Sequence, residues 1–221
     1  MCEQDPSQEP SDQAPAIDDG IPTNASAPAA VIAEIVPAVQ PTRTQKLYAK
    51  AVFYPTLAWN YTLGRILGVR RWWDYIDAHV IVGAYPFAGD VPGLAAEGVK
   101  AVVNTCEEYP GPLAAYEAFG ISQFWMPTTD FTHPSLENVK LAVEFVEEHT
   151  HVDETVYIHC KAGRARSATV ALCWLMKYRG LSIEQAQEKL LLARPHINPH
   201  LGDRPVVKQF AQQLAQESNG R

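Results

Sequence analysis

Residues 156–170, VYIHCKAGRARSATV, lead from an apolar strand through a cysteine into a short loop and a helix. The loop carries three cations and a glycine, which are Lys161, Arg164, Arg166 and Gly163. In such an arrangement the backbone N–H groups at the start of the helix point at the cysteine sulfur. Together with the cations they favour the thiolate, which lowers the pKa of a cysteine below about 8.5. The stretch therefore predicts that Cys160 is a nucleophile at neutral pH.

The same loop predicts a phosphate ligand. Loop N–H groups fit the equatorial oxygens of a phosphoryl group, and one arginine can hold two of these oxygens at once. We expect the phosphate to be bound by Lys161, Ala162, Gly163, Arg164, Ala165 and Arg166. The alternative is a buried strand cysteine beside ordinary surface cations. The order of strand, cysteine, glycine, arginine and helix favours the catalytic interpretation.

From residue 74 onward, short β-rich runs alternate with helical stretches. The expected strands cover residues 79–85, 99–105, 121–127 and 154–160. The expected helices lie near residues 90–98, 112–119, 134–149, 165–179, 182–193 and 203–217. The last strand is almost wholly apolar, as is usual when helices cover both faces of a parallel sheet. The sequence therefore predicts an α/β fold with a central, mostly parallel sheet flanked by helices.

Residues 1–42 differ in composition from the remainder of the chain. They carry seven acidic residues, seven of the 17 prolines and no Lys or Arg, so they account for the whole net charge of −7. Such a segment has too little large apolar surface to offset chain entropy, and we expect it to be disordered. It lacks the cationic start and the apolar core of a targeting signal. The remainder is neutral, which argues against an extended nucleic-acid-binding surface.

Residues 43–73 combine cations with aromatic side chains. Six cations and no acid occur between Arg43 and Trp73. The longest uncharged run, residues 51–64, has 14 residues, whereas a helix that spans a bilayer needs about 20. One expectation is that the segment lies on an anionic membrane surface, where each cation contributes roughly 1 kcal/mol. The other is that it packs on the body as two helices broken at Pro55.

The cysteines give no sign of a metal site. Their positions, Cys2, Cys106, Cys160 and Cys173, lack metal-ligand spacing, and nothing in the sequence indicates an oxidising compartment. We therefore expect a reduced, intracellular protein that uses no metal and no other cofactor. The expected division is a tail over residues 1–42, a basic aromatic helical segment over 43–73 and a catalytic α/β domain over 74–218.

The spacing His159-Cys160, five residues, Arg166-Ser167 resembles the signature of the cysteine-dependent protein-tyrosine-phosphatase superfamily. The resemblance implies a protein-tyrosine-phosphatase-like fold of the dual-specificity type. It also implies that Arg166 holds the phosphate and the transition state, and that Ser167 helps the thiolate to leave. His159 would orient the surroundings of the cysteine, and the other loop cations would add positive potential.

The resemblance also implies a general acid for the departing alkoxide. Enzymes of this superfamily place an aspartate on a mobile loop roughly thirty residues before the cysteine, and a general acid contributes about 10²–10⁴ in rate. Here Asp130 lies in the loop MPTTDFTHPS, thirty residues before Cys160. His133 is the only other titratable residue of that loop and is the alternative acid.

Four separated stretches resemble the mitochondrial-type lipid phosphatases of this superfamily. They are FYPTLAWN (53–60), WWDYIDAHVIVGAYPF (72–87), NTCEEY (104–109) and HCKAGRARSAT (159–169), and the likeness covers residues 43–212. It implies hydrolysis of phosphatidylglycerophosphate to phosphatidylglycerol, a step of cardiolipin synthesis, through a phosphocysteine intermediate. A protein tyrosine or dual-specificity phosphatase and a phosphoinositide phosphatase are the alternatives. A non-catalytic phosphate-binding module is a third alternative, against which the intact set of Cys, Arg, Ser and Asp argues.

The acidic loop after the second expected strand offers candidate head-group contacts. Glu107 and Glu108 are expected on the same rim of the sheet as the phosphate loop. We expect them to accept hydrogen bonds from the hydroxyls of a glycerol head group and to repel polyanionic head groups. Tyr109 would pack against lipid or line the pocket. The alternative is that both acids are solvated residues of a turn.

Cys106 is a candidate redox partner of Cys160. It ends a strand expected to neighbour the Cys160 strand, so the two Cα atoms could lie within the ~4.4–6.8 Å of a disulfide. The pattern Asn-x-Cys at 104–106 resembles phosphoinositide 3-phosphatases of the superfamily, which implies reversible oxidation. The alternative is a buried core cysteine.

These observations predict the binding partners, the oligomeric state and the cellular location of the protein. We expect a phospholipid substrate, peripheral contact with an anionic membrane, no nucleic acid and a monomeric chain. The expected location is the cytoplasmic face of a membrane. The matrix side of the mitochondrial inner membrane is the alternative that the resemblance implies.

Overall fold

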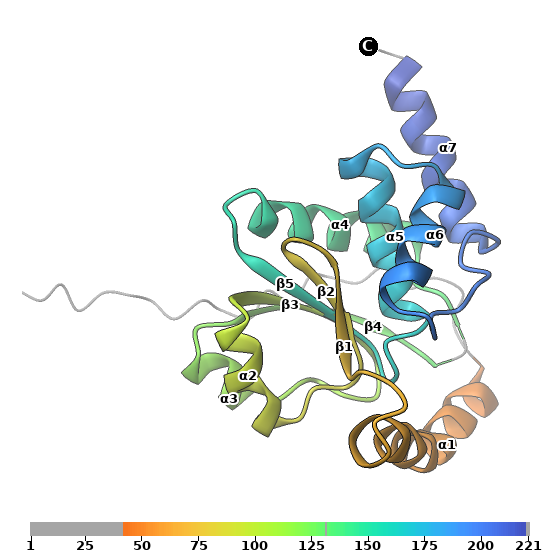
Figure 1. Cartoon of the computed structure of the whole chain (residues 1–221). Helices are drawn as coiled ribbons and strands as arrows, with labels where there is room; N and C mark the ends of the chain where they lie inside the picture. The colour runs from red at the N-terminus through yellow and green to blue at the C-terminus, as the bar shows by residue number, and fades with distance from the viewer. Residues whose placement is uncertain (1–41, 131, 220–221) are drawn as a thin grey trace, which may run out of the picture.

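The structure, a computed structural model, describes residues 42–130 and 132–219. The segment expected to be disordered, residues 1–42, therefore lies outside the described residues except for Thr42. The described part of the chain forms a single sheet with helices on both faces (Figure 1). This arrangement is the α/β fold that the alternating pattern predicts.

The sheet has five strands in the order β1-β2-β5-β3-β4. Their bounds are β1 Trp73–Asp77, β2 Val80–Gly83, β3 Val99–Cys106, β4 Ser122–Thr128 and β5 Thr155–His159. Four strands are parallel, and β1 pairs antiparallel with β2 at one edge. Every residue of the central strand β5 is buried, because helices cover both of its faces.

Strand β1 is the element that the sequence pattern missed. It is short and carries Asp74 and Asp77, and aspartate is disfavoured in strands. Asp74 is nevertheless 5% exposed, because its carboxylate pairs with Arg194, which is far away in the sequence. A tertiary contact therefore overrides the local preference at this edge of the sheet.

Two helical layers sandwich the sheet (Figure 1). The larger apolar core lies between the sheet and α4 Leu136–Thr150, α5 Arg166–Arg179, α6 Ile183–Ala193 and α7 Pro205–Asn219. The smaller core lies on the other face, under the short helices α2 Val91–Ala96 and α3 Leu113–Ala118. Burying each large apolar side chain contributes about 1.5–3 kcal/mol, so these two layers fix the sheet.

Helix α5 is the most buried helix of the fold. Its first eleven residues, 166–176, are all buried, and it ends at Gly180, which has a left-handed φ of +65°. Because α5 packs directly against the sheet, its first turn is held firmly at the carboxyl ends of the strands. That turn follows the phosphate loop.

Helix α1 Arg43–Tyr61 runs along the end of the domain and continues into a π-helical turn, Thr62–Ile66. Pro55 lies inside α1, so the expected break into two helices is wrong. The Thr56 hydroxyl shares its one donor between the carbonyls of Val52 and Phe53 in the turn that contains the proline. In residues 42–130 and 132–219, no helix combines the length and the apolarity needed to cross a membrane.

The inner face of α1 packs on the body of the domain. Phe53 is 3% exposed and contacts the Tyr85 ring, with 6.2 Å between ring centroids. Tyr61 packs edge to face on Trp72 and on Phe87. The inner face of α1 therefore packs on the domain, while its outer face is exposed.

Candidate active site

The phosphate loop, residues 160–165, connects β5 to α5. Its backbone passes so close to the backbone at the end of β2 that only glycine fits at the point of contact. Gly163 has a φ of +64°, and a Cβ there would lie 2.5 Å from the carbonyl of Gly83. Gly83, at the end of β2, is equally constrained, since its Cβ would lie 2.1 Å from the Tyr157 hydroxyl. The loop is thus pressed against the neighbouring strand end, and its curvature is fixed.

The Cys160 thiol sits at the centre of this loop. The Ser167 hydroxyl donates to Cys160 Sγ at 3.3 Å, and the backbone N–H groups of Ser167 and Arg164 also point at the sulfur. Burial alone would raise the pKa of the thiol. The Arg166 guanidinium and the hydrogen bonds outweigh burial and lower this pKa from 9.0 to about 7. A large fraction of Cys160 is therefore thiolate at neutral pH.

Arg166 begins α5 and points back into the loop. Its Nη1 donates to the Thr128 carbonyl at 2.6 Å and to Glu108 Oε2 at 3.0 Å, and its Nη2 lies 3.1 Å from Asp130 Oδ1. The guanidinium is 4% exposed. Burial disfavours its charge, but the surrounding thiols and carboxylates raise its pKa above the ordinary value. Three fixed contacts therefore orient a cation beside the cysteine.

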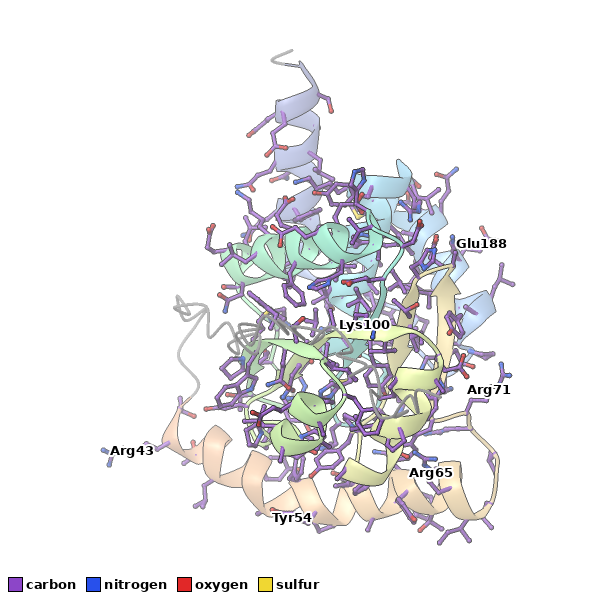
Figure 2. All side chains as sticks on the ribbon, turned by 90° about the vertical axis from the view of Figure 1, so that its left-hand side faces the viewer. Arg43, Tyr54, Arg65, Arg71, Lys100 and Glu188 are labelled. Atoms are coloured by element: carbon purple, nitrogen blue, oxygen red, sulfur yellow. The ribbon has the colours of Figure 1, made fainter. Side chains whose placement is uncertain are left out.

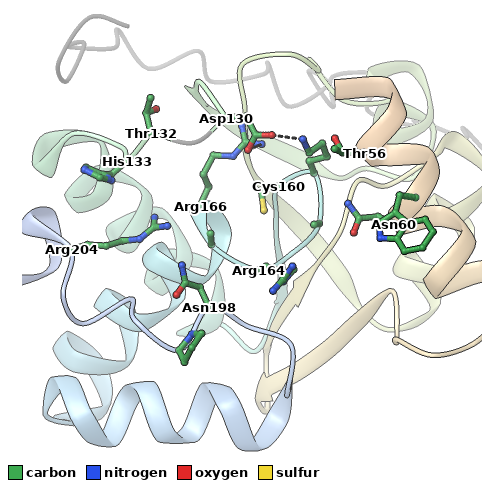
Figure 3. Close-up of a pocket in the computed structure, with 15 residues that line it drawn as sticks. Thr56, Asn60, Asp130, Thr132, His133, Cys160, Arg164, Arg166, Asn198 and Arg204 are labelled. Atoms are coloured by element: carbon green, nitrogen blue, oxygen red, sulfur yellow. Dashed lines mark hydrogen bonds and ion pairs between the residues drawn. The ribbon is translucent and has the colours of Figure 1, made fainter. Parts of the chain in front are cut away.

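Asp130 lies on the loop after β4, and its carboxylate faces the phosphate loop (Figure 3). It forms ion pairs with Arg166 and with the ammonium of Lys161. Its backbone N–H donates to Glu108 Oε1 at 3.0 Å. The structure thus brings the predicted acid, the predicted phosphate ligands and the predicted nucleophile into one site.

His133, the alternative acid, lies farther along the same loop. Figure 3 shows it on the side of the cavity that also holds Arg204. Burial and the nearby Arg204 charge lower the pKa of His133, so its ring is neutral at neutral pH. Asp130 forms ion pairs with two phosphate-loop cations, and no such ion pair is present for His133 among the described residues.

A cavity of about 740 Å³ opens over Cys160 (Figure 3). Four segments line it: the phosphate loop, the loop after β4, helix α1 and the segment before α7. From α1 come Thr56, Trp59 and Asn60, and from the segment before α7 come Asn198, Pro199 and Arg204. The sequence analysis did not place α1 or Arg204 at the site, because nothing in their local pattern refers to Cys160.

The acidic loop lies outside this cavity lining, in contrast to the expected head-group contact. Glu108 is occupied by Arg166 and by the Asp130 backbone, and Glu107 accepts a hydrogen bond from the Thr129 hydroxyl. Tyr109 stacks on Tyr85 with 3.8 Å between ring centroids, and its hydroxyl donates to the Pro86 carbonyl at 2.8 Å. A buried guanidinium needs a counter-charge, and the Glu108 carboxylate supplies it to Arg166. Glu108 therefore does not line the cavity.

His159 and Cys106 are both buried beneath the loop. The His159 carbonyl accepts from the Thr105 hydroxyl at 2.8 Å, and burial lowers the pKa of the imidazole to about 3. Cys106 ends β3 as a free thiol, and burial raises its pKa. Its N–H donates to Asn104 Oδ1 at 2.9 Å. Pairing of Cys106 with Cys160 on oxidation stays a prediction.

Arg194 supports the loop from below and was missed by the sequence analysis. It follows α6, is 1% exposed, and donates to the Gly163 carbonyl at 2.8 Å and to Asp74 Oδ2 at 2.5 Å. It also donates to the Arg71 carbonyl at 3.1 Å. A lone arginine at the end of an amphipathic helix has the sequence pattern of a surface cation, so no local signal distinguished it.

Comparisons with known proteins agree with this geometry. Residues 80–213 match the family described as Dual specificity phosphatase, catalytic domain. The chain is 37% identical over 165 residues to Phosphatidylglycerophosphate phosphatase PTPMT2 of Arabidopsis thaliana, which covers 73% of this chain and 72% of that protein. It is 32% identical to Phosphatidylglycerophosphatase and protein-tyrosine phosphatase 1 of Rattus norvegicus over 176 residues, which covers 76% of this chain and 91% of that protein.

A solved structure also resembles the chain. The crystal structure of PTPMT1 in complex with PI(5)P matches with a TM-score of 0.62 and 29% identity, over 67% of this chain and 99% of that chain. The predicted fold and the predicted resemblance are both confirmed by these comparisons.

Proposed function

The chain belongs to the dual specificity phosphatase family and is a cysteine-dependent phosphatase, and we propose that its substrate is phosphatidylglycerophosphate. The observation that supports this proposal best is the similarity to phosphatidylglycerophosphate phosphatases over about three quarters of the chain. The similarity includes the segment of α1 that lines the catalytic cavity in the structure. The product would be phosphatidylglycerol.

In the first step that we propose, the Cys160 thiolate attacks the phosphorus atom of the terminal phosphomonoester. A sulfur–phosphorus bond forms and the bond to the glycerol oxygen breaks. Arg166 and the loop N–H groups hold the equatorial oxygens, whose charge is greatest in the transition state. Asp130 donates a proton to the departing glycerol alkoxide. In the unliganded site Arg166 and Lys161 pair with the Asp130 carboxylate. The incoming phosphoryl oxygens replace that carboxylate as counter-charge, and Asp130 takes up from solvent the proton that it then donates.

In the second step, water attacks the phosphocysteine. Asp130, now a carboxylate, accepts a proton from the water, and the sulfur–phosphorus bond breaks to release inorganic phosphate. The Ser167 hydroxyl, 3.3 Å from the sulfur, stabilises the departing thiolate. Glu108 acts through its contacts with Arg166 and with the Asp130 backbone, so we assign it a positioning role.

The proposed substrate also requires contact with a lipid surface. The outer face of α1 and the turn after it expose large apolar side chains, including Leu47, Tyr54, Trp59, Ile66 and Leu67, with exposed fractions between 61% and 73%. Figure 2 shows Arg43 and Tyr54 along this helix. Cations flank the apolar side chains, a composition suited to anionic membranes. Because α1 also lines the cavity, docking this face would bring the cavity mouth to the lipid head groups.

A phosphoinositide monophosphate is the second candidate substrate. A solved relative, PTPMT1, is described in complex with PI(5)P. This lipid shares with phosphatidylglycerophosphate a phosphomonoester on a polar head group and a phosphodiester to diacylglycerol. The location stays a prediction, either at the cytoplasmic face of a membrane or at the matrix side of the mitochondrial inner membrane.

The decisive experiment compares phosphate release from three substrates by the full chain. These are phosphatidylglycerophosphate in vesicles, PI(5)P in vesicles and a phosphotyrosine peptide, with Cys160→Ser as the inactive control. We expect kcat/KM to be highest for phosphatidylglycerophosphate. Equal values for all three substrates, or a preference for the peptide, would overturn the proposed substrate while leaving the phosphatase activity intact.

A further inference from the structure

The catalytic cavity contains a second cationic region, separate from the cation that holds the reacting phosphate. Arg204 lies just before α7 and lines the same cavity as Cys160. In Figure 3 its guanidinium extends into the cavity from the side that holds His133, opposite α1. Its Nη1 donates to the Thr169 hydroxyl at 3.0 Å, which fixes the side chain against α5.

The cations of the cavity differ in their counter-charges. Arg166 and Lys161 are paired with carboxylates, as described above. In the part of the chain that the structure describes, neither Arg204 nor Arg164 forms an ion pair with a carboxylate. Arg164 instead donates from Nε to the His196 carbonyl at 2.7 Å. The cavity therefore holds two arginines whose charge is neutralised by no acidic side chain among residues 42–130 and 132–219.

Arg204 is also partly removed from water. Burial lowers the pKa of its guanidinium, and the Cys160 thiolate acts in the opposite direction. Removing a cation from water is unfavourable unless an anion or hydrogen-bond acceptors replace the lost solvation. Of the five N–H donors of the guanidinium, only one is used within the described part of the chain, by Thr169, which leaves the others to a ligand that enters the cavity. The neighbouring His133 ring, neutral at neutral pH, can offer a further N–H.

We propose that Arg204, with His133 beside it, forms a second anion subsite that binds the phosphodiester of the lipid substrate while Arg166 holds the phosphomonoester. The proposal rests on the proposed function and deepens it, because phosphatidylglycerophosphate carries its two phosphoryl groups on either side of one glycerol. A phosphotyrosine side chain carries a single phosphoryl group and cannot fill both sites. The subsite therefore selects substrates that have a second phosphate at short distance from the first.

The test compares two substrates in a matched pair of variants and in one conservative variant. Arg204→Gln removes the subsite cation, and Lys208→Gln makes the same charge change on α7 at a residue outside the cavity lining, where Lys208 lies 3.7 Å from Asp203. The substrates are monomeric dihexanoyl phosphatidylglycerophosphate and p-nitrophenyl phosphate. We expect Arg204→Gln to lower kcat/KM for the lipid about 10- to 100-fold more than for p-nitrophenyl phosphate, mainly through KM. Lys208→Gln should change both substrates alike, and Arg204→Lys should restore part of the loss.

A general effect on folding would lower activity on both substrates by the same factor, and this outcome overturns the subsite. So does an unchanged preference for the lipid in Arg204→Gln. If the wild-type enzyme does not prefer the lipid, the proposed function fails, and the subsite is then judged on soluble competitors. Glycerol 1,3-bisphosphate should compete with p-nitrophenyl phosphate at least tenfold better than glycerol 3-phosphate, and Arg204→Gln should abolish that difference. Equal competition by the two compounds in the wild type would refute the subsite.

Discussion

The phosphate loop and helix α1 form two walls of one cavity, and they are held in different ways. Cys160, Arg166 and Ser167 on the loop wall are between 0% and 4% exposed, and each is fixed by hydrogen bonds or ion pairs. On the α1 wall Trp59 is 63% exposed, and the helix is anchored on the body through a few residues such as Phe53. The loop wall is rigid because the core holds it, whereas the α1 wall rests on the surface.

This difference suggests that the loop wall carries out the chemical steps and that the α1 wall contacts the lipid surface. Bond making and breaking needs atoms held within a fraction of an ångström, which buried and over-determined contacts provide. Contact with a lipid needs exposed apolar and cationic side chains, which a well-packed wall could not offer. We therefore expect substitutions on the loop wall to change rate constants and the pKa of Cys160. Substitutions of the exposed apolar side chains on the outer face of α1 should instead change binding to lipid surfaces.

The largest expected effect concerns the acid that faces the loop wall. Asp130→Asn should lower kcat about 10²–10⁴-fold on an alkyl phosphomonoester, because the alkoxide then leaves without a proton. His133→Gln is the matched control for the alternative acid and should lower kcat far less. Single-turnover measurements on both variants check the assignment. A larger loss of kcat in His133→Gln than in Asp130→Asn would reverse the roles of the two residues.

The next effect concerns the surface of the α1 wall. Leu67→Ser should weaken binding to vesicles that contain anionic lipid about tenfold, since burying one large apolar side chain contributes about 1.5–3 kcal/mol. Leu192→Ser on α6 is the control, because Leu192 is 78% exposed on a helix away from α1 (Figure 1). Vesicle sedimentation measures the binding, and added salt should weaken it. Equal binding by the two variants would contradict a membrane-docking role for α1.

A smaller effect concerns the pKa of Cys160 itself. The wild-type thiol should react with iodoacetamide at a rate that is half-maximal near pH 7 and falls as the pH drops, because the thiolate is the reactive form. Ser167→Ala removes a hydrogen bond that lowers this pKa, so the profile should move to higher pH and alkylation at pH 6 should slow several-fold. Cys160→Ser identifies the alkylated residue. An unmoved profile would show that Ser167 does not stabilise the thiolate.

The smallest effect is visible only after oxidation. Cys106→Ser should keep most of its activity, since Cys106 lies under the loop wall and outside the cavity lining. After peroxide, the wild type should recover with dithiothreitol, and Cys106→Ser should recover less, if the two sulfurs form a disulfide that protects Cys160 from further oxidation. Irreversible loss in the wild type, equal to that of the variant, would refute this protection.

The sequence predicted the strand, loop and helix of the loop wall because their determinants are local. The strand, Cys160, Gly163, Arg166 and the following helix are consecutive, so their spacing alone predicts the nucleophile and the phosphate ligands. The alternation of strands and helices likewise predicted the parallel part of the sheet. Bounds differed by a few residues, for example residues 79–85 against Val80–Gly83 for β2.

The misses share a different physical origin, since each depends on a partner far away in the sequence. The sequence did not predict that the Glu108 carboxylate pairs with the buried Arg166, and the expected contact of Glu108 with a head group stays a prediction. Strand β1 was not recognised because Asp74 is compatible with a buried edge only when Arg194 pairs with it. Pro55 was expected to break α1, but the helix continues through it, and Phe53 beside it packs on the body of the domain. The secondary-structure propensities of neighbouring residues carry no information about these distant contacts.

Arg194 also determines how short a functional version of this enzyme can be. The family match begins at Val80, downstream of Asp74 and of the Arg71 and Trp72 carbonyls, all of which accept hydrogen bonds from this guanidinium. A truncated protein that began at Val80 would retain the arginine and lose its carboxylate. Breaking a buried ion pair in this way costs about 3–5 kcal/mol, a large share of the roughly 5–15 kcal/mol that holds a typical domain together. The cooperative folding unit therefore starts upstream of the boundary that homology marks, and expression trials should keep residue 71 and the residues that precede it.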